Sequence, residues 1–567
     1  MTAARLVSRA GERALLPCLV LLFSALSILP FGRLLAEGVA PKGVPSLDAI
    51  VAALGRSSTW VATVHSLEVA VGGTVLAVFL GSAVALTVTL TDARLRSAFI
   101  FCFVLPLMIP PQVTALAWLQ VLAPSSPLLG LLGFEPRLGQ PNPLYSRQGI
   151  ILILGLQYAP LVFLALRAGL RGLPGDLIEA ARAAGGRPWT VLRTIILPLM
   201  APHLVAATAL SFVSCVGNFG IPAFLGIPAN YLVLPTLIYQ RLAGLGPTSL
   251  SEVSVLALVI GLIALTGIIL QGIMTRGHDS RTMMMSVATR PFTLGGWQRP
   301  VTWVMWLVVV GMLGLPVLGL LSTSLVPAYG VALSAASATL ENYNFVLFGH
   351  AASKRAMVNS FLLAAAAAVI VIAISVVLAY FLVWRRSVLL SLLNLAAELP
   401  YAVPGVVLAI ASILVFLKPL PLVGFSLYNT VWIILFAYVA RFLVLGLRPV
   451  VGGYSQLDRG LEEAAQVAGA GFFTRLRTII LPVISPSAVA GGFLVFMTAF
   501  NELTVSALLW SSGAETLGVV VFGFEQGGES TYASALALVT VVVTLALMLA
   551  TLVAGRALPK GALPWRD

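Results

Sequence analysis

Two nearly identical segments, 284 positions apart, hold the residues of this chain best suited to act on another molecule. Each begins with Glu-Ala-Ala, at 179–181 and at 463–465, and each closes with Leu-Arg-Thr-Ile-Ile-Leu-Pro. Of the 20 aligned positions that start at 179 and at 463, 13 are identical. Each copy lies in a polar, arginine-containing interruption between long apolar runs, which indicates a loop that docks a partner. A duplication at a fixed offset also marks a chain built from two similar halves.

The remaining reactive side chains show no arrangement for catalysis or metal binding. Cys18, Cys102 and Cys215 fall inside apolar runs without paired spacing, and the four histidines are scattered. No catalytic residue, metal site or bound cofactor is therefore predicted. The sequence also lacks the G-x-x-x-x-G-K-[ST] phosphate loop, so the chain is not expected to hydrolyse a nucleotide itself.

The composition is that of an integral membrane protein. Hydrophobic residues make up 59% of the 567 positions and charged residues only 9%, and mean hydropathy is +1.03. A net charge of +13 could indicate nucleic acid as a partner. The positive residues are instead spread over short loops, without a basic tail or an aromatic platform, which argues against nucleic acid and leaves membrane lipid as the surroundings.

Twelve apolar segments are long enough to cross a bilayer, whose core of about 30 Å requires about 20 helical residues. The first is longer than the apolar region of a signal peptide, so it is predicted to remain as a span. The twelve lie near 14–35, 61–90, 97–122, 149–170, 199–223, 252–274, 301–325, 358–384, 389–417, 427–447, 483–509 and 532–553. Kinks are expected in the third span of each half at Pro106, Pro110, Pro111, Pro400 and Pro404.

The distribution of Lys and Arg predicts the orientation, because short loops rich in them stay in the cytoplasm. With the N-terminus inside, 23 of the 33 Lys and Arg residues face the cytoplasm, as do both termini and both Glu-Ala-Ala segments. An even number of spans in each half gives both halves the same orientation. The predicted fold is thus all-α, with two parallel six-helix repeats at 1–280 and 301–567 and a cytoplasmic linker at 281–300.

Each Glu-Ala-Ala segment is predicted to form two short helices around a turn. In the first copy, Asp176 and Glu179 have the spacing of a helix cap, Gly185-Gly186 permits a turn, and 189–196 forms the second helix. In the second copy Gly469 provides the turn and Gly460 replaces the capping residue. These docking loops span about 173–198 and 457–482. Helices that merely cover loop backbone at the membrane surface remain an alternative, although two copies that retain the same residues favour docking.

The spacing Glu-Ala-Ala, three residues, Gly, nine residues, Ile, one residue, Leu-Pro resembles the cytoplasmic loop of permease subunits of binding-protein-dependent ABC importers. The resemblance covers essentially the whole chain, as a fused pair of units with the type I importer permease fold. It implies that each loop is a coupling helix that inserts into an ATPase subunit. Glu179, Ala180, Ala181 and Gly185 would dock one ATPase, and Glu463, Ala464, Ala465 and Gly469 the other.

The same resemblance implies the partners and the location. Two separate ATP-binding subunits would bind ATP and Mg, an extracytoplasmic solute-binding protein would deliver the solute, and the complex would lie in a bacterial inner membrane. Fused chains resemble ferric-iron and thiamine permeases, and the stretches Gly217–Gly226 and Asn501–Thr504 look most like the ferric-iron group. Asn218 departs from the acidic residue expected there. Ferric iron is thus the expected solute, with thiamine, a polyamine or another small solute as alternatives.

Charged residues inside predicted spans are candidates for function because they are costly in a bilayer. Glu68 and Glu502, together with Asn218, are predicted to line the translocation pathway and favour a cationic solute, unless neighbouring polar groups simply satisfy them. Glu398 and Arg441 are predicted at similar depths on neighbouring helices. A structural ion pair between these two residues is therefore expected.

Two other classes of membrane protein compete with this interpretation. A proton-coupled carrier with twelve spans shares the parallel repeat, and the sequence at 92–96 superficially resembles a loop motif of that group. Such a carrier has no reason to duplicate a docking loop before its fifth and eleventh spans. A structural or receptor protein without transport activity is disfavoured by the same paired loops.

Overall fold

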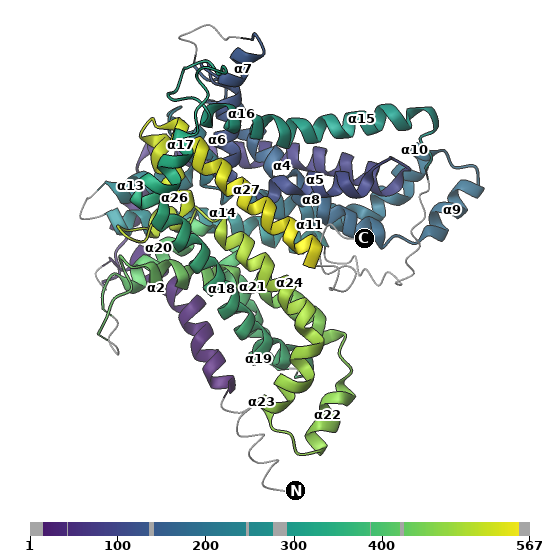
Figure 1. The fold of residues 1–567 in the computed structure, drawn as a ribbon. Helices are drawn as coiled ribbons and strands as arrows, with labels where there is room; N and C mark the ends of the chain where they lie inside the picture. The colour runs from purple at the N-terminus through teal and green to yellow at the C-terminus, as the bar shows by residue number, and fades with distance from the viewer. Residues whose placement is uncertain are drawn as a thin grey trace.

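The secondary structure of the chain in the computed structural model is helical (Figure 1). The structure describes residues 15–41, 44–134, 141–244, 249–275, 292–385, 387–419 and 424–554. Ten helices in these ranges are long and apolar enough to cross a membrane, and two bent helix pairs raise the number of spans to as many as twelve. The predicted all-α membrane fold with twelve spans is therefore confirmed. Positions 281–291 of the predicted linker at 281–300 lie outside the described residues, as do residues 1–14 and 555–567.

The spans of the two halves correspond in order. In the first half they are Leu15–Val39, which ends in α2 (Leu29–Val39), then α4 (Ser57–Leu90), α5 with α6 (Arg96–Met108, Pro111–Leu122), α8 (Arg147–Arg171), Pro188–Val216, which contains α10 (Pro188–Val191) and α11 (Leu197–Val216), and α14 (Ser249–Thr275). In the second half they are Gly295–Ser324, which contains α15 (Gln298–Val309) and α16 (Leu315–Ser324), then α18 (Ala351–Trp384), α19 with α20 (Val388–Ala402, Gly405–Phe416), α21 (Val431–Ser455), Phe472–Phe500, which contains α23 (Phe472–Arg475) and α24 (Leu481–Phe500), and α27 (Ser530–Ala554).

Short helices connect these spans. They are α3 (Asp48–Leu54), α7 (Pro127–Leu131), α9 (Gly175–Ala183), α12 (Gly220–Leu225), α13 (Leu234–Ala243), α17 (Glu341–Asn344), α22 (Arg459–Val467), α25 (Ser506–Leu509) and α26 (Leu517–Gln526). Two of them, α9 and α22, belong to the repeated segments. Two others, α12 and α25, follow the fifth span of each half.

The third span of each half is sharply broken at a proline. The bend between α5 and α6 is 101° and that between α19 and α20 is 109°. Pro110 and Pro404 directly precede the second helix of each pair, and the residues before them, Ile109 and Val403, are extended. A proline has no N–H and disfavours helical geometry in the residue before it. The predicted kink in the third span of each half is therefore confirmed, as a full break at Pro110 and Pro404, whereas Pro106 and Pro400 lie inside α5 and α19.

A π turn precedes Pro198 and its counterpart Pro482 in the repeated segments. The turns cover Leu192–Ile196 and Leu476–Ile480, and in the first the N–H of Leu197 bonds to the carbonyl of Leu192. Because proline cannot donate and its ring crowds the preceding turn, the wider π turn accommodates it. The predicted separate second helix at 189–196 is therefore wrong: it is continuous with α11 in one span, Pro188–Val216.

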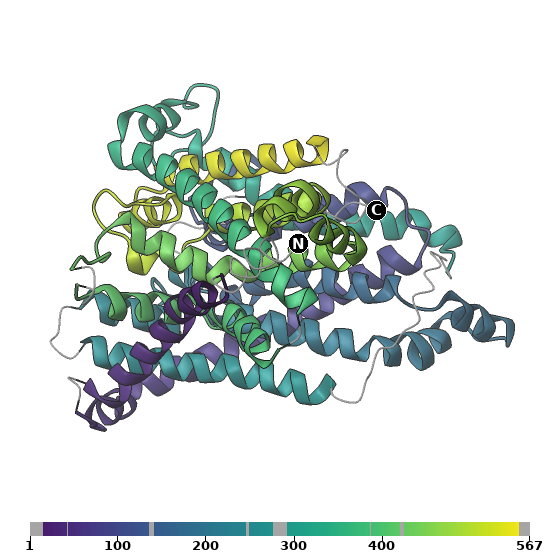
Figure 2. The same cartoon turned by 90° about the horizontal axis from the view of Figure 1, so that it is seen from below.

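The two halves form two diverging arms (Figure 1). One arm contains α4, α5, α8 and α11 and ends near α9, and the other contains α18, α19, α21 and α24 and ends near α22. The first span of each half crosses to the opposite arm: α2 packs on α20, and α16 packs on α6. From below, α9 lies at the right-hand edge and α22 near the N-terminal mark (Figure 2). The two repeated segments are thus held at separate ends of one interlocked bundle.

The start of the second half is attached to the loop that follows α4. The N–H of Leu294 donates to Asp92 Oδ1 at 2.9 Å, and Gln298 Nε2 donates to the carbonyl of Asp92 at 2.7 Å. Helical structure begins at Gly295, before the predicted boundary at 301. Asp92, in the stretch that superficially resembles a carrier motif, therefore anchors the junction between the two halves.

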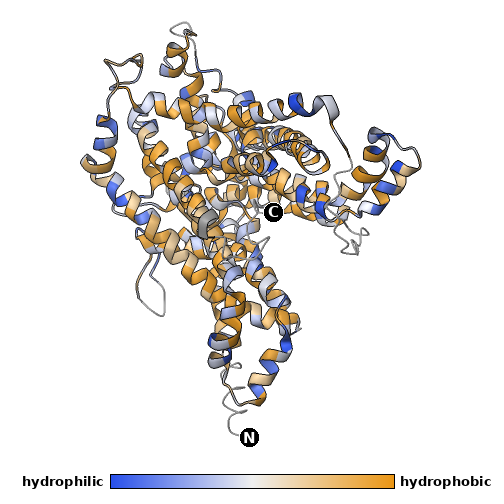
Figure 3. Ribbon diagram, turned by 45° about the vertical axis from the view of Figure 1, so that its right-hand side comes forward, coloured by the Kyte–Doolittle hydropathy of each residue, from blue (hydrophilic) through white to orange (hydrophobic). Residues whose placement is uncertain are grey.

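Apolar residues run along the long helices, whereas hydrophilic residues gather at helix ends and on the projecting short helices (Figure 3). Small residues let the spans approach closely where α4 packs on α8. A Cβ at Gly81 would lie 2.5 Å from the carbonyl oxygen of Ala159, and one at Gly73 would lie 2.9 Å from Leu154 Cβ. Close helix packing at glycine is typical of membrane bundles.

Candidate functional site

The first docking loop consists of α9, a turn at Gly185 and the start of the span Pro188–Val216. Glu179 and Ala180 are exposed on α9, and Ala181 is half-buried. Gly185 has a φ of +84°, which favours glycine, and a Cβ there would meet no atom within 4 Å. The turn therefore requires glycine for its backbone conformation and leaves the surface above it open.

The second docking loop repeats this geometry. Glu463 and Ala464 are exposed on α22, Ala465 is half-buried, and Gly469 has a φ of +88°. Arg459 Nε lies 2.9 Å from Glu463 Oε1, one helical turn away, and both side chains are more than half exposed. A pair this exposed is weak and can exchange for contacts with another protein.

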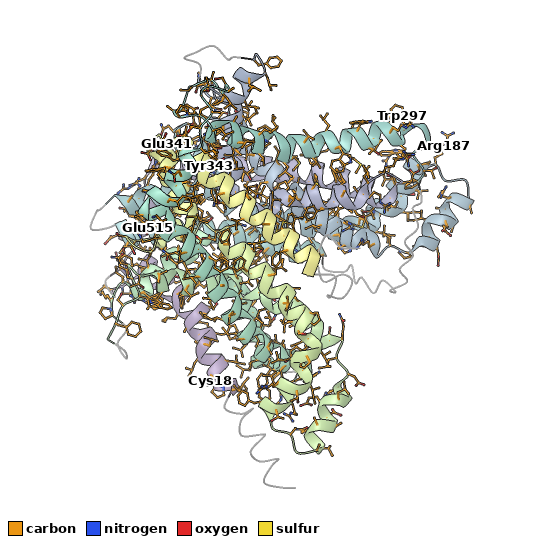
Figure 4. The ribbon with its side chains drawn as sticks, in the orientation of Figure 1. Cys18, Arg187, Trp297, Glu341, Tyr343 and Glu515 are labelled. Atoms are coloured by element: carbon orange, nitrogen blue, oxygen red, sulfur yellow. The ribbon has the colours of Figure 1, made fainter. Side chains whose placement is uncertain are left out.

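Both loops project from the ends of the arms. In Figure 4, Arg187, which follows the Gly185 turn, lies at the end of the arm that carries α9. The predicted residues of each loop are therefore brought together on one exposed element, and the two loops are kept apart. This arrangement presents two similar surfaces rather than one composite site.

The helix caps differ from the predicted ones. Pro174, not Asp176, precedes α9, and Asp176 lies in its first turn. At the equivalent place before α22, Asp458 caps the helix by accepting a hydrogen bond from the N–H of Gly460 at 2.8 Å. The prediction was wrong because each helix begins earlier than expected, directly after Pro174 or Asp458.

The two loops are supported in different ways, which was not predicted from the sequence. Beneath α22, Arg475 Nε lies 3.3 Å from Glu462 Oε1. Tyr380 of α18 donates to the same carboxylate at 3.4 Å. At the equivalent positions of the first loop, Ile178 and Val191 are both buried. The sequence carries a signal of this difference. At the fixed offset of 284, two apolar residues of the first loop are replaced by two oppositely charged residues in the second.

A cavity of about 440 Å³ lies where the two halves meet. Its wall contains both breaks of the third spans, the ends of α11 and α24, and parts of α8, α14 and α21. Asn218 and Glu502, two of the predicted pathway residues, belong to this wall. The charged residues of the wall all come from the second half: Glu398, Arg441, Arg448 and Glu502.

Contacts between the halves surround this cavity. Asn501 Nδ2, at the end of α24, donates to the carbonyl of Met108 in the first-half break at 2.8 Å. Gln112 Nε2 donates to the carbonyl of Asn501 at 3.4 Å. On the other side, a Cβ at Gly217 would lie 3.3 Å from Pro404 Cβ in the second-half break. Each break thus contacts the end of the fifth span of the opposite half.

Glu398 pairs with Arg448 of α21, not with the predicted Arg441. Asn394 Nδ2 also donates to Glu398 Oε1 at 2.9 Å, whereas Arg441 Nη1 donates weakly to the carbonyl of Val403 at 3.5 Å. The helices α19 and α21 are neighbours, as expected. Arg448 lies about two turns along α21 from Arg441. The predicted depth of Arg441 was counted from a span end at 447, but α21 continues to Ser455, so Arg441 lies farther from that end than expected.

Glu68 lies apart from the residues that line the cavity. Its carboxylate accepts a hydrogen bond from Tyr231 Oη at 2.7 Å and lies 3.4 Å from Arg147 Nη1. The ring of His65 stacks on Tyr231 with 3.7 Å between the ring centres. Glu68 therefore connects α4 to the start of α8 and to the loop that precedes α13.

Comparison with known proteins places these features in a family. The family model described as binding-protein-dependent transport system inner membrane component matches residues 73–284 and 371–562. The two matched stretches cover well over half of the chain. Each begins within the second span of a half and includes one docking loop.

Individual relatives agree with this match. The chain is 29% identical over 419 residues to a probable ABC transporter permease of Sinorhizobium fredii. The aligned region covers 71% of this chain and 70% of that protein. A ferric transport system permease of Actinobacillus pleuropneumoniae is 25% identical over 469 residues, 80% of this chain and 65% of that protein. A molybdenum transport system permease of Mycobacterium tuberculosis is 28% identical over 214 residues, 37% of this chain and 79% of that protein.

Proposed function

We propose a transport function for this chain from the premise that it belongs to the family of binding-protein-dependent transport system inner membrane components. In this proposal it is the membrane-spanning permease of an ATP-driven importer, and a binding protein outside the membrane delivers the solute. The observation that carries the proposal is the pair of exposed docking loops, one at the end of each arm.

The energy for transport comes from partner chains in this proposal. Each docking loop binds one ATPase subunit, through Glu179, Ala180, Ala181 and Gly185 in one case and Glu463, Ala464, Ala465 and Gly469 in the other. The partners bind ATP and Mg, and this chain acts as a transport subunit rather than an enzyme. Both loops and both termini face the cytoplasm, in keeping with the excess of Lys and Arg on that side.

Movement of the loops is transmitted to the cavity along the fifth span of each half. The first docking loop runs through one continuous span, Pro188–Val216, whose far end leads to Asn218 in the cavity wall. The second runs through Phe472–Phe500 to Glu502. When ATP brings the two ATPase subunits together, the loop ends of both spans approach each other. The cavity then closes to one side of the membrane and opens to the other.

Ferric iron is the solute that we propose. The support is that a ferric transport permease matches 80% of this chain, whereas the molybdenum relative matches only 37%. Asn218 and Glu502 serve as pathway residues in this proposal because they lie in the cavity wall. Thiamine, a polyamine or another small solute would use the same machinery with different cavity contacts.

Two measurements test the proposed function. Tagged chain purified from its native membrane should bring down an ATP-binding subunit with two copies per permease, and the complex should hydrolyse ATP. Cells that express the complete importer should take up radioactive ferric iron in an ATP-dependent manner. Transport by the chain alone, driven by a proton gradient and without an ATPase, would contradict the proposal and support the carrier.

A further inference from the structure

Two pairs of equivalent residues in the cavity wall are neutral in the first half and charged in the second. Gln157 of α8 corresponds to Arg441 of α21, and Asn218 after α11 corresponds to Glu502 after α24, each at the offset of 284. All four line the cavity. The first half thus presents two neutral polar side chains where the second half presents a cation and an anion.

Gln157 and Arg441 perform the same structural task. Gln157 Nε2 donates to the carbonyls of Pro106 and Ile109, at 3.0 and 3.2 Å, in the first-half break. Arg441 Nη1 donates to the carbonyl of Val403, the equivalent of Ile109, at 3.5 Å. Breaking a helix leaves carbonyls without partners, and a neutral amide satisfies them in the first half. The positive charge of Arg441 is therefore not needed to stabilise the break.

Asn218 and Glu502 also share a task. Asn218 Oδ1 accepts a hydrogen bond from the N–H of Ile221, at 2.9 Å, at the start of α12. Glu502 accepts from the N–H groups of Val505 and Ser506, at 2.7 and 3.1 Å, at the start of α25. A side-chain oxygen suffices to cap a helix start, as Asn218 does. The negative charge of Glu502 is therefore not needed for the cap.

The two surplus charges are available to the cavity. The other charged pair in the wall, Glu398 and Arg448, is already joined as an ion pair. Arg441 and Glu502 attract each other, but within the described ranges they form no direct ion pair. Glycine at 405 gives the guanidinium its space, because a Cβ there would lie 2.6 Å from Arg441 Nη1. Charges inside a membrane protein are costly and usually mark the path of a solute.

We propose that Arg441 and Glu502 contact the solute in the cavity through their charges, so that the second half recognises the solute. The proposal rests on the proposed function and names the solute class. A separated cation and anion complement a small solute that carries both signs of charge on different sides. Such a solute is either a zwitterion or a metal ion that keeps an anionic ligand in its coordination shell.

Mutual neutralisation is the competing explanation, since each charge could exist only to offset the other. The double variant R441Q/E502N separates the two explanations because it copies Gln157 and Asn218 of the first half. It removes both charges together and keeps a donor and an acceptor at the two positions. The variant is expressed with the complete importer, and assembly is measured by copurification of the ATPase.

Uptake is measured with two probes. One is ferric iron supplied with phosphate, and the other is the zwitterion glycine betaine. The probe that the wild type transports shows whether the solute is a metal ion with an anionic ligand or a zwitterion. The double variant should assemble normally and lose at least about tenfold in uptake. Uptake by the double variant within twofold of the wild type would overturn the proposal and leave mutual neutralisation as the explanation for the two charges. Failure of the variant to assemble would show that the charges are structural and would also overturn the proposal.

The wild-type controls distinguish this inference from the proposed function. If the wild-type complex contains its ATPase but transports neither probe, the solute class inferred from Arg441 and Glu502 is wrong while the importer function stands. If no ATPase copurifies with the wild-type chain, the proposed function itself fails. The single variants R441Q and E502N should each reduce uptake at least as much as the double variant.

Discussion

Glu462 and Arg475 form a buried ion pair beneath the second docking loop, with 3.3 Å between Oε1 and Nε and side-chain exposures of 7% and 0%. The first docking loop has Ile178 and Val191 at the same two positions, and both are buried. Two loops with nearly the same outer surface are therefore supported by different physical means. A buried ion pair depends on both partners, because removal of one leaves the other charged and desolvated.

Removal of one partner of this pair should destabilise the second docking loop. We expect the R475M variant to lose about 3–5 kcal/mol in the stability of this region, because Glu462 is then buried without its partner. The double variant E462I/R475V, which copies the first loop, should recover most of that loss. Thermal unfolding and limited proteolysis of the purified complex measure both effects.

The exposed pair at the surface of the same loop provides the matched control. Arg459 and Glu463 are more than half exposed, so R459A should change stability by less than about 1 kcal/mol. A double variant E462I/R475V that is no more stable than R475M would show that the pair does more than fill the space occupied by Ile178 and Val191.

Alanine at the turn glycines should impair both docking loops. Gly185 and Gly469 have φ values of +84° and +88°, and forcing alanine into this region costs about 1–2 kcal/mol per residue. We expect G185A and G469A each to weaken binding of the ATPase, measured by copurification. Gly471 is the control, because it has a φ of −67° and a Cβ there would meet no atom within 4 Å. A loss of ATPase with G471A as large as with G469A would contradict the argument.

Charge reversal on the docking helices should disconnect the permease from its ATPases. E179K and E463K replace exposed carboxylates, so the chain should still insert and fold. Loss of a charged interface contact costs about 2 kcal/mol or more, which is roughly thirtyfold in affinity. Quantitative copurification and solute uptake measure the loss. E341K, at an exposed position of α17, should retain wild-type ATPase binding. Wild-type uptake by both docking variants would refute the coupling role.

Glu68 should prove dispensable for uptake. Its carboxylate is bound by Tyr231 and Arg147 and lies apart from the cavity wall. E68Q keeps an oxygen acceptor for Tyr231, and Glu68 is 38% exposed, so we expect a stability loss of at most about 1 kcal/mol. Uptake at normal expression should stay within twofold of the wild type. An uptake defect as large as that of E502N would place Glu68 in the pathway after all.

The sequence by itself determined the membrane fold and the position of the two repeated helix–turn segments. Span length and hydropathy depend on local composition, so the amino-acid sequence alone is enough to count twelve spans. The repeated segment is equally local: in both copies its turn glycine has a positive φ and its proline follows a π turn. The prolines likewise predicted a kink in the third span of each half, although only the structure shows that the breaks fall at Pro110 and Pro404.

Only the tertiary structure decided which charges meet. Glu398 pairs with Arg448 rather than Arg441, because the choice depends on how each helix is rotated and on where α21 ends. The ion pair of Glu462 with Arg475 likewise joins residues on separate elements beneath the loop. Hydropathy reports the burial of a span but not the direction of one side chain. The position of Arg441 and Glu502 around a single cavity therefore emerged only when the two halves were packed together.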